Sequence, residues 1–207
     1  RQILPYEFKA PVGEIMGRRI STLAGLQNGS LSVVVCPVRA FLEPTISTSD
    51  LTGNSIALKT GQEADLDEIV QRLISLGFTR VPNVEEVGDF ARRGGVIDFF
   101  SPGSEAPVRV EFFGDEIDTI RHFDVASQRT IDRVDRIAIY PRREIPITPE
   151  SLENHLARLN EDDAEYIRGR YLNDPELPGL EWLAIMFGIE QGSILDYFGD
   201  GGIRFDG

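Results

Sequence analysis

Residues 108–117 read VRVEFFGDEI, and this stretch decides the fold of the central part of the chain. Side chains of a β-strand alternate between its two faces, so the two valines and the first phenylalanine share one face. Arg109 and Phe113 share the opposite face with a glutamate. The Gly114-Asp115 dipeptide predicts a two-residue turn into a second antiparallel strand. Arginine and aromatic residues are enriched at the energetic centres of protein interfaces, so the second face is a candidate contact surface. The alternative is that helices of the chain cover both faces.

The residues around this stretch extend it into an α+β unit. RRGGVIDFF at 92–100 predicts another strand pair, and short strands are expected at 56–58 and near 134–139. Asp65, followed by Glu68, has the pattern of a reciprocal N-terminal helix cap. The helix that begins there has an apolar stripe and ends at Gly77. We therefore expect residues 54–141 to form one α+β domain built on an antiparallel sheet.

The segment before this domain, residues 1–53, has a different character. Apolar residues at helical spacing predict a helix over 12–26 that stops at Asn28-Gly29, and Pro37 opens a second, short helix. Residues 31–36 between them are nearly continuous in apolar side chains, which is typical of a strand buried on both faces. This order is typical of the second half of a doubly wound α/β unit whose beginning is missing.

The segment after the domain, residues 142–207, is predicted to be mainly helical. Thr148 and Pro149 form a strong helix start, and apolar spacing continues to about residue 171. A further helix is expected over 178–188, followed by a return to strand at 193–198.

The chain has a formal net charge of −13, and this charge is spread unevenly. Residues 1–53 carry +1, residues 54–141 carry −6 and residues 142–207 carry −8. A protein that binds nucleic acid by itself should present a basic surface, because neutralising phosphates supplies most non-specific affinity. The arginines of the central segment lie among carboxylates, which suits protein recognition better than DNA wrapping.

The sequence contains no convincing catalytic, metal or cofactor site. It lacks both the G-x-x-x-x-G-K-[ST] phosphate loop and G-x-G-x-x-G. Lys59-Thr60-Gly61 spells a β-lactamase triplet, but its S-x-x-K partner motif is absent. His122 and His155 are isolated and lack the spacing of metal ligands. Carboxylate pairs such as Asp115-Glu116 are typical of solvated turns, so we predict no catalysis by this chain.

Length and cysteine content add limits on size and compartment. At 207 residues the chain is long enough for one generous domain or two small ones. Its single cysteine, Cys36, cannot form an intrachain disulfide, and its apolar surroundings predict a buried thiol. This fits a reducing, cytoplasmic setting. No apolar run approaches the roughly 18 residues of a membrane span, and no signal peptide is visible. The chain lacks an initial methionine and stops abruptly, so we expect a piece of a larger protein.

Several motifs between residues 55 and 141 together resemble one known module. They are GFTR at 77–80, RRGG at 92–95, IDFF at 97–100, VRVEFFGDEI at 108–117 and IRHFD at 120–124. This order and spacing resemble the UvrA-binding domain shared by the excision-repair protein UvrB and the bacterial transcription-repair coupling factors. SQRT at 127–130 is more similar to the coupling factors.

A second feature separates these two relatives. UvrB carries a long, tyrosine-rich β-hairpin just before the helix that corresponds to residues 13–26. Here Leu4-Pro5-Tyr6-Glu7 runs almost directly into that helix and leaves no room for the hairpin. The resemblance therefore favours the coupling factors, whose UvrB-like part is a degenerate, non-hydrolysing copy. The alternative is a fragment of a UvrB-type ATPase or helicase that verifies DNA damage.

The resemblance implies a domain arrangement. In these families the module is inserted into a RecA-like, doubly wound α/β domain that is split in two parts. Residues 1–53 would be the tail of the first part, residues 54–141 the inserted α+β domain, and residues 142–207 the start of the second part.

The resemblance also implies UvrA as the partner and four contact residues, Arg93, Arg109, Phe113 and Asp115. The alternation of side chains independently groups Arg109 with Phe113, whereas Gly94-Gly95 can bulge and leaves the face of Arg93 open. Phe113 would supply apolar area, both arginines would bind acidic groups of UvrA, and Asp115 would bind a basic one.

The remaining implications concern parts beyond this chain. The full-length coupling factor would bind RNA polymerase and double-stranded DNA, and would use ATP and magnesium as a DNA translocase. Docking would then recruit UvrA to a polymerase stalled at damage, and a C-terminal domain would mask the docking face at rest. We expect no cofactor within the chain itself.

Overall fold

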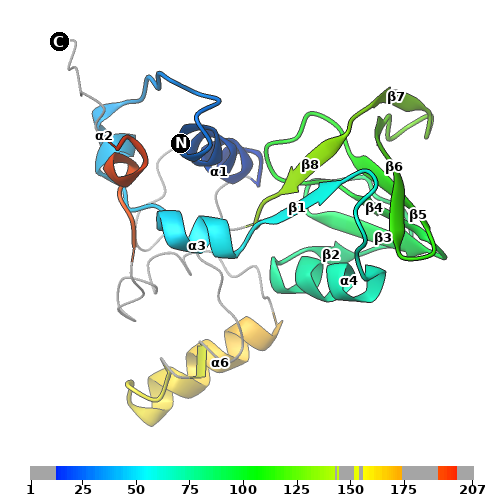
Figure 1. Ribbon diagram of the computed structural model, residues 1–207. Helices are drawn as coiled ribbons and strands as arrows, with labels where there is room; N and C mark the ends of the chain where they lie inside the picture. Colours follow the sequence, from blue (N-terminus) through cyan, green and yellow to red (C-terminus); the bar gives the residue numbers. More distant parts are fainter. Residues whose placement is uncertain (1–12, 143, 145–151, 154–155, 174–190, 200–207) are drawn as a thin grey trace.

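The computed structural model describes residues 13–142, 144, 152–153, 156–173 and 191–199 (Figure 1). Its β-rich part is a six-stranded sheet with the strand order β2-β3-β4-β5-β6-β7. Neighbouring strands run antiparallel except β2 and β3, which are parallel, so the predicted antiparallel sheet is mixed at one edge. The strands are Thr79–Arg80 (β2), Asp89–Arg93 (β3), Val96–Phe99 (β4), Val108–Phe113 (β5), Glu116–Phe123 (β6) and Thr130–Arg133 (β7).

One face of this sheet, the inner face, is covered by a helix and a second sheet. The helix is α4 (Leu66–Ser75), and the second sheet pairs β1 (Ile56–Lys59) with β8 (Arg136–Ile139) in antiparallel orientation. A single apolar core joins all three layers. Its fully buried members include Leu73 of α4, Ile139 of β8, and Phe90, Ile97, Val108, Val110 and Ile117 of the sheet.

The ends of α4 follow the local sequence. The Asp65 carboxylate accepts hydrogen bonds from the backbone N–H groups of Asp67 at 2.7 Å and Glu68 at 3.2 Å, which satisfies two otherwise unpaired donors. Gly77 has a φ of 87°, a left-handed conformation that ends a helix at little steric cost to glycine. The predicted start and end of this helix are confirmed.

The segments that flank the β-rich part pack against each other. Their helices are α1 (Gly13–Gln27), α2 (Val38–Leu42), α3 (Thr48–Gly53) and the 3₁₀ turn η1 (Ile194–Tyr197). Ile20, Leu23, Leu51 and Tyr197 belong to one buried cluster. The Tyr197 hydroxyl donates a hydrogen bond to the carbonyl of Ile46 at 2.8 Å, and burial raises the pKa of this tyrosine. The described residues of these flanks contain no doubly wound sheet, so only a mixed α/β class is established.

The predicted strand at residues 31–36 is wrong. The segment is not a strand, Val33 and Val35 are 76% and 94% exposed, and the Cys36 thiol is half-buried instead of buried. A strand buried on both faces needs neighbouring strands and covering layers. Within the described residues no strand pairs with this segment, and only one side of it meets a buried cluster, through Val34. Its apolar composition is therefore not enough to form a strand.

The predicted strand at residues 193–198 is also wrong, because a local cap directs it into a 3₁₀ turn. The Ser193 side chain accepts a hydrogen bond from the Leu195 N–H, and Asp196 accepts one from the Ser193 N–H, which is a capping box. Farther back, α6 (Glu161–Asn173) lies within the predicted helical stretch. The helix expected at 178–188 lies outside the described residues. No helix in the described part combines the length and apolar character needed to cross a membrane.

Candidate functional site

The face of the six-stranded sheet that points away from α4, here called the outer face, carries Arg93, Arg109 and Phe113. Residues paired across neighbouring strands point to the same face. One row across the sheet consists of Arg93, Val96, Glu111 and Thr119, and the next of Ala91, Asp98, Arg109, Arg121 and Arg133. The pairing of Arg93 with Val96 places Arg93 on this face. The sequence alone did not predict the face of Arg93, because Gly94 and Gly95 follow it. Arg109 and Phe113 are four residues apart on β5, so their Cα atoms are about 13 Å apart.

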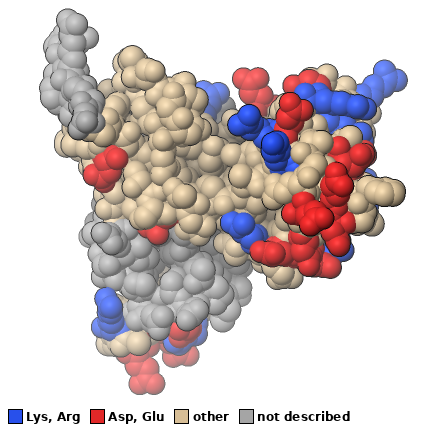
Figure 2. All heavy atoms as spheres, viewed as in Figure 1, with Lys and Arg blue, Asp and Glu red and all other residues tan. Residues whose placement is uncertain are grey.

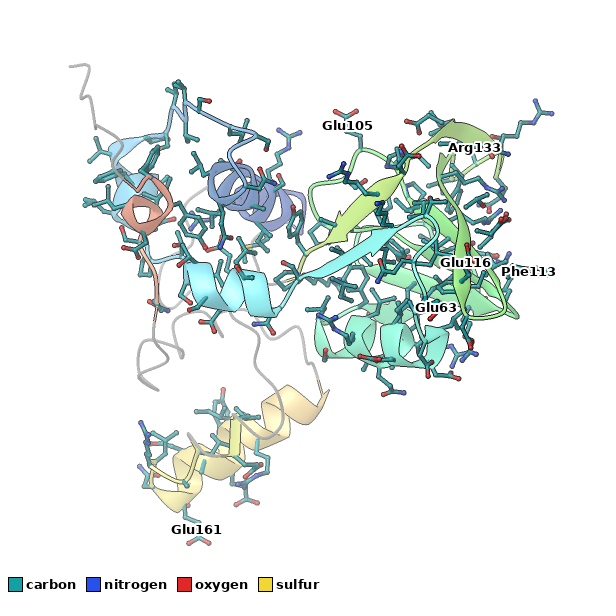
Figure 3. All side chains as sticks on the ribbon, viewed as in Figure 1. Glu63, Glu105, Phe113, Glu116, Arg133 and Glu161 are labelled. Carbon is teal, nitrogen blue, oxygen red and sulfur yellow. The ribbon has the colours of Figure 1, made fainter. Side chains whose placement is uncertain are left out.

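Phe113 is 84% exposed and projects from the end of β5 (Figure 3). Its neighbour Phe112 lies on the inner face and packs against the core. Phe113 pairs with Glu116 across the turn, and Gly114 has a φ of 64°. The predicted alternation and the two-residue turn are therefore confirmed. Among the described residues, no helix covers Phe113, so the alternative of two covered faces fails at this position.

Arg109 is held by contacts within the chain. Its guanidinium donates to Asp98 through Nε at 2.6 Å and through Nη2 at 2.7 Å, and the two side chains are 16% and 5% exposed. The hydrogen bonds that Arg109 donates to this carboxylate raise the pKa of Arg109 above its ordinary value. The guanidinium also lies 4.7 Å from the ring centroid of Phe123, within the range of a cation–π contact. Arg109 is thus held by its own domain through an ion pair and a ring contact, and little of it is exposed.

Arg93 is exposed but also oriented. Its Nη2 donates to the carbonyl of Pro82 at 2.7 Å and to the side chain of Asn83, both in the loop between β2 and β3. The loop therefore fixes where this guanidinium lies relative to the sheet, while leaving it accessible to a partner.

Asp115 lies in the turn after Phe113, with its backbone anchored and its side chain exposed. Its carbonyl accepts a hydrogen bond from the N–H of Ala64 at 2.8 Å. Within the described part of the chain, its carboxylate has no hydrogen-bond or ion-pair partner. Glu63 and Glu116 form a backbone bridge beside it, and Glu116 is the cross-strand neighbour of Phe113 (Figure 3). The tip of the hairpin is therefore acidic.

Sequence reasoning missed the carboxylates that organise the outer face. Glu111 binds Arg121 at 2.6 Å, just as Asp98 binds Arg109. Three arginines lie side by side in one row, and like charges in direct cross-strand pairs are destabilising unless compensated. The signal for Asp98 was its position as the lone charge within the apolar strand VIDFF. Its pairing with Arg109 depended on a strand register that the sequence did not provide.

Charges of both signs occur over the β-rich part of the molecule. Figure 2 shows blue and red side chains intermixed there, and mostly uncharged side chains over the helices α1–α3. Arg133 projects at the edge strand β7, and its side chain forms no hydrogen bond or ion pair within the described residues (Figure 3). A partner would meet a mosaic of charges and not one continuous basic surface.

The described residues contain no group of three or more His, Cys, Asp or Glu that could hold a metal ion. His122 contacts Asp132 on the neighbouring strand, with Nδ1 2.8 Å from Oδ1. This is a cross-strand pair on the sheet, and His155 lies outside the described residues.

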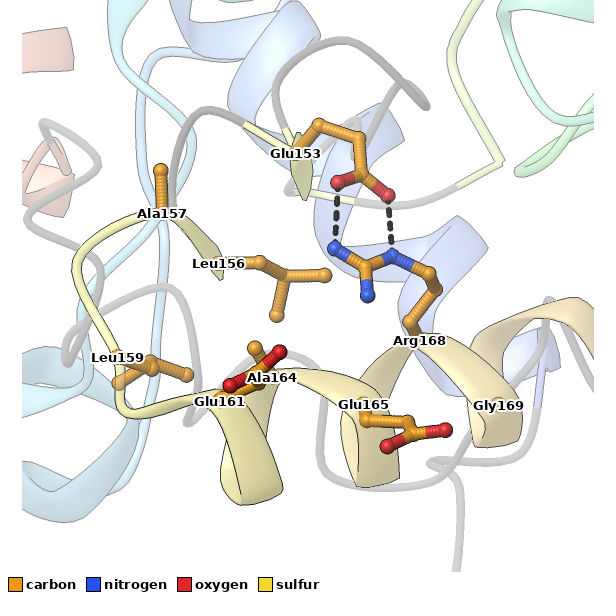
Figure 4. Close-up of a pocket in the computed structure, with 9 residues that line it drawn as sticks. All are labelled: Glu153, Leu156, Ala157, Leu159, Glu161, Ala164, Glu165, Arg168 and Gly169. Atoms are coloured by element: carbon orange, nitrogen blue, oxygen red, sulfur yellow. Dashed lines mark hydrogen bonds and ion pairs between the residues drawn. The ribbon is translucent and has the colours of Figure 1, made fainter.

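A separate groove of about 720 Å³ lies beside α6 (Figure 4). Leu156 and Ala164 form its apolar floor, and Arg168 closes one side with two hydrogen bonds of 2.8 Å to Glu153. This pairing lowers the pKa of Glu153 and raises that of Arg168. None of the predicted contact residues lines this groove.

Comparison with known proteins places these features in a family. Residues 56–145 match the family model of the UvrB interaction domain. The chain is 32% identical over 202 residues to the transcription-repair-coupling factor of Haemophilus influenzae, and 32% identical over 203 residues to that of Escherichia coli K12. Each alignment covers 95% of this chain and 18% of the relative. The factor of Mycobacterium tuberculosis is 40% identical over 141 residues, which are 65% of this chain and 11% of that protein. The chain thus spans less than a fifth of the length of these relatives.

Proposed function

Because the chain belongs to the family of the transcription-repair-coupling factors and carries a UvrB interaction domain at residues 56–145, we propose that its outer face docks the excision-repair protein UvrA. The observation that carries this proposal is the 84% exposure of Phe113 at the end of β5, on the same face of the sheet as Arg93 and Arg109. Burying a phenylalanine contributes roughly 1.5–3 kcal/mol, and this side chain gains almost none of that within the chain. A partner's pocket supplies the missing burial.

The charges around Phe113 indicate which charges the surface of the partner should carry. Arg93 and Arg109 lie toward one side of the ring and match acidic groups of the partner. Asp115 lies in the turn on the other side and matches a basic group. Charge-assisted hydrogen bonds of this kind are stronger than neutral ones, and opposite charges at two ends of an interface fix its orientation.

The role of the whole coupling factor follows as the wider part of this proposal. Docking through the outer face brings UvrA to an RNA polymerase stalled at DNA damage. Binding of polymerase and double-stranded DNA, and translocation driven by ATP with magnesium, belong to parts of the protein beyond this chain. Within this proposal, residues 1–53 are the tail of the first part of a split RecA-like domain, and residues 142–207 are the start of its second part. Residues 54–141 are the α+β domain inserted between them.

The direct test is the affinity of the chain for UvrA, measured by calorimetry. We expect Phe113→Ala to weaken binding by about 2 kcal/mol, roughly thirtyfold, as for an interface hot spot. Its melting temperature should not change, because the side chain is exposed. Val35→Ala is the matched control, since Val35 is 94% exposed but lies outside the UvrB interaction domain. Unchanged affinity of both Phe113→Ala and Arg93→Ala would reject the outer face as the docking surface.

A further inference from the structure

Arg109 is contacted on three sides by residues of its own domain. Asp98 occupies the edge formed by Nε and Nη2, the Phe123 ring covers one face, and the Gln128 Oε1 accepts a hydrogen bond from Nη2 at 3.0 Å. The side chain is only 16% exposed, although it lies on the face we assign to docking.

Gln128 is itself held in place by its loop. It has a φ of 57° and is the non-glycine residue with positive φ in the described part of the chain. Its Nε2 donates to the Val125 carbonyl at 2.9 Å, and its backbone N–H donates to the Asp124 carbonyl at 2.8 Å. The Asp124 carboxylate accepts hydrogen bonds from both the N–H and the hydroxyl of Ser127. A left-handed backbone is unfavourable for a residue with a side chain, so this loop holds Gln128 in place against its conformational preference.

Some N–H donors of the Arg109 guanidinium are not used within the chain and are available to a partner. A guanidinium has five N–H donors, and Asp98 and Gln128 use the one on Nε and both on Nη2. The two donors on Nη1 form no hydrogen bond or ion pair with the described residues. Because no buried side-chain nitrogen or oxygen there lacks a partner, Nη1 reaches the surface. The guanidinium therefore offers one nitrogen to a partner, in a fixed position.

We propose that Asp98 and Gln128 are positioning residues, which lock Arg109 in one orientation so that Nη1 meets a carbonyl or carboxylate oxygen of the docking partner. This inference rests on the proposed docking of UvrA. Immobilising a long side chain weakens an association, and here that entropy is lost during folding instead of during binding. Without the lock the same contact still forms, but with lower affinity.

The test uses the whole chain and a pair of variants of similar length, Gln128→Met and Gln128→Glu. Methionine removes the acceptor for Arg109, whereas glutamate retains an acceptor oxygen at that position. We expect Gln128→Met to bind UvrA about fivefold more weakly by calorimetry, and Gln128→Glu to bind within about twofold of the wild type. Thr130→Ala is the control for disturbance of the same exposed region and should leave affinity unchanged.

Two further readouts separate positioning from mere stabilisation. Nitrogen-15 NMR should show the Arg109 Nε–H protected from solvent exchange in the wild type and less protected in Gln128→Met, at unchanged melting temperature. In an Arg109→Ala background, Gln128→Met should have no further effect on affinity, because a positioning residue acts only through the group that it holds.

The outcomes distinguish this inference from the function on which it rests. Equal affinity of wild type and Gln128→Met, with Phe113→Ala weakened, would overturn the positioning role and leave the docking proposal intact. Loss of affinity by Gln128→Met in the Arg109→Ala background would also overturn it, because Gln128 would then contact the partner directly. No binding of UvrA by the wild type would overturn both.

Discussion

The ion pair between Asp98 and Arg109 is nearly withdrawn from solvent, with side chains 5% and 16% exposed. A pair in such a place adds little net stability, because removing two charges from water offsets most of their attraction. Its two hydrogen bonds instead fix the direction of the guanidinium. This favours a role in recognition over one in folding, and the two roles predict different effects of substitution.

Replacing Asp98 alone should destabilise the protein strongly. Asp98→Ala leaves a guanidinium that is mostly buried without its counter-charge, which typically costs about 3 kcal/mol in the free energy of unfolding. The double variant Asp98→Leu/Arg109→Met removes both charges and should lie within about 1 kcal/mol of the wild type. Denaturation by urea measures both values. A double variant as unstable as Asp98→Ala would show that the pair serves mainly to stabilise the fold.

The Asp124 carboxylate offers a test at acidic pH. Hydrogen bonds from the hydroxyl and the N–H of Ser127 lower the pKa of this carboxylate. A lowered pKa means that its contribution to stability is present above the ordinary pKa of aspartate and is lost as pH falls through the lowered value. Ser127→Ala should therefore raise the pKa of Asp124 toward its ordinary value, measured by NMR titration of the carboxyl carbon. An unchanged pKa would contradict the assigned hydrogen bonds.

At the scale of elements, features that depend on near neighbours in sequence were predictable. The alternation in β5, the turn at Gly114-Asp115 and the cap at Asp65 all involve residues within a few positions, and all three are confirmed. Within the candidate site, the shared face of Arg109 and Phe113 could also be predicted. The pairing of Arg109 with Asp98 could not be predicted. These residues are 11 positions apart in sequence, and their pairing depends on the register of β4 against β5.

The two strands that were wrongly predicted fail for different reasons. Residues 31–36 have the composition of a buried strand, but a strand forms only where another strand or layer receives it. At residues 193–198, the capping box of Ser193 and Asp196 stabilises a 3₁₀ turn, although the apolar composition is typical of a strand. Apolar composition thus predicted a strand at both places, although it carries no information about partner strands or local caps.

The difference between a buried and an exposed apolar residue predicts how far each truncation lowers the free energy of unfolding. Ile97→Ala, at a fully buried position of β4, should lower the free energy of unfolding by about 2–5 kcal/mol. Val35→Ala, at a position that is 94% exposed, should change it by less than about 0.5 kcal/mol. Chemical denaturation compares them under one set of conditions. A loss above 1 kcal/mol for Val35→Ala would show that residues 31–36 are packed in solution.

At the scale of the whole molecule, the first and last strands of the β-rich part lie side by side. Its first strand, β1, pairs with its last, β8, so Ile56 lies opposite Ile139 and the chain enters and leaves at one place. The contacts with the flanking helices lie near that place. Arg19 of α1 binds Glu144, which follows β8, at 2.5 Å, and it also binds Glu43 of its own flank at 3.0 Å. Helix α1 also approaches Gly103 so closely that a Cβ on Gly103 would lie 2.4 Å from the Ser21 Cβ and 2.9 Å from the Gly17 carbonyl oxygen.

Excision of residues 54–144 should therefore give a domain that folds and docks by itself. Every member of its main core lies between Ile56 and Ile139, so removing the flanks leaves that core complete. What is lost is the ion pair of Arg19, the approach of α1 to Gly103 and the packing of Tyr140 against the buried cluster of the flanks, and none of these contacts involves Phe113. We expect one cooperative thermal transition and an affinity for UvrA within about threefold of the whole chain, because fewer than 0.7 kcal/mol of binding would depend on the flanks. Phe113→Ala should weaken the excised domain as much as it weakens the whole chain. If the excised domain folds but binds more than tenfold more weakly, the flanking helices contribute directly to the docking surface, and the outer face is only part of it.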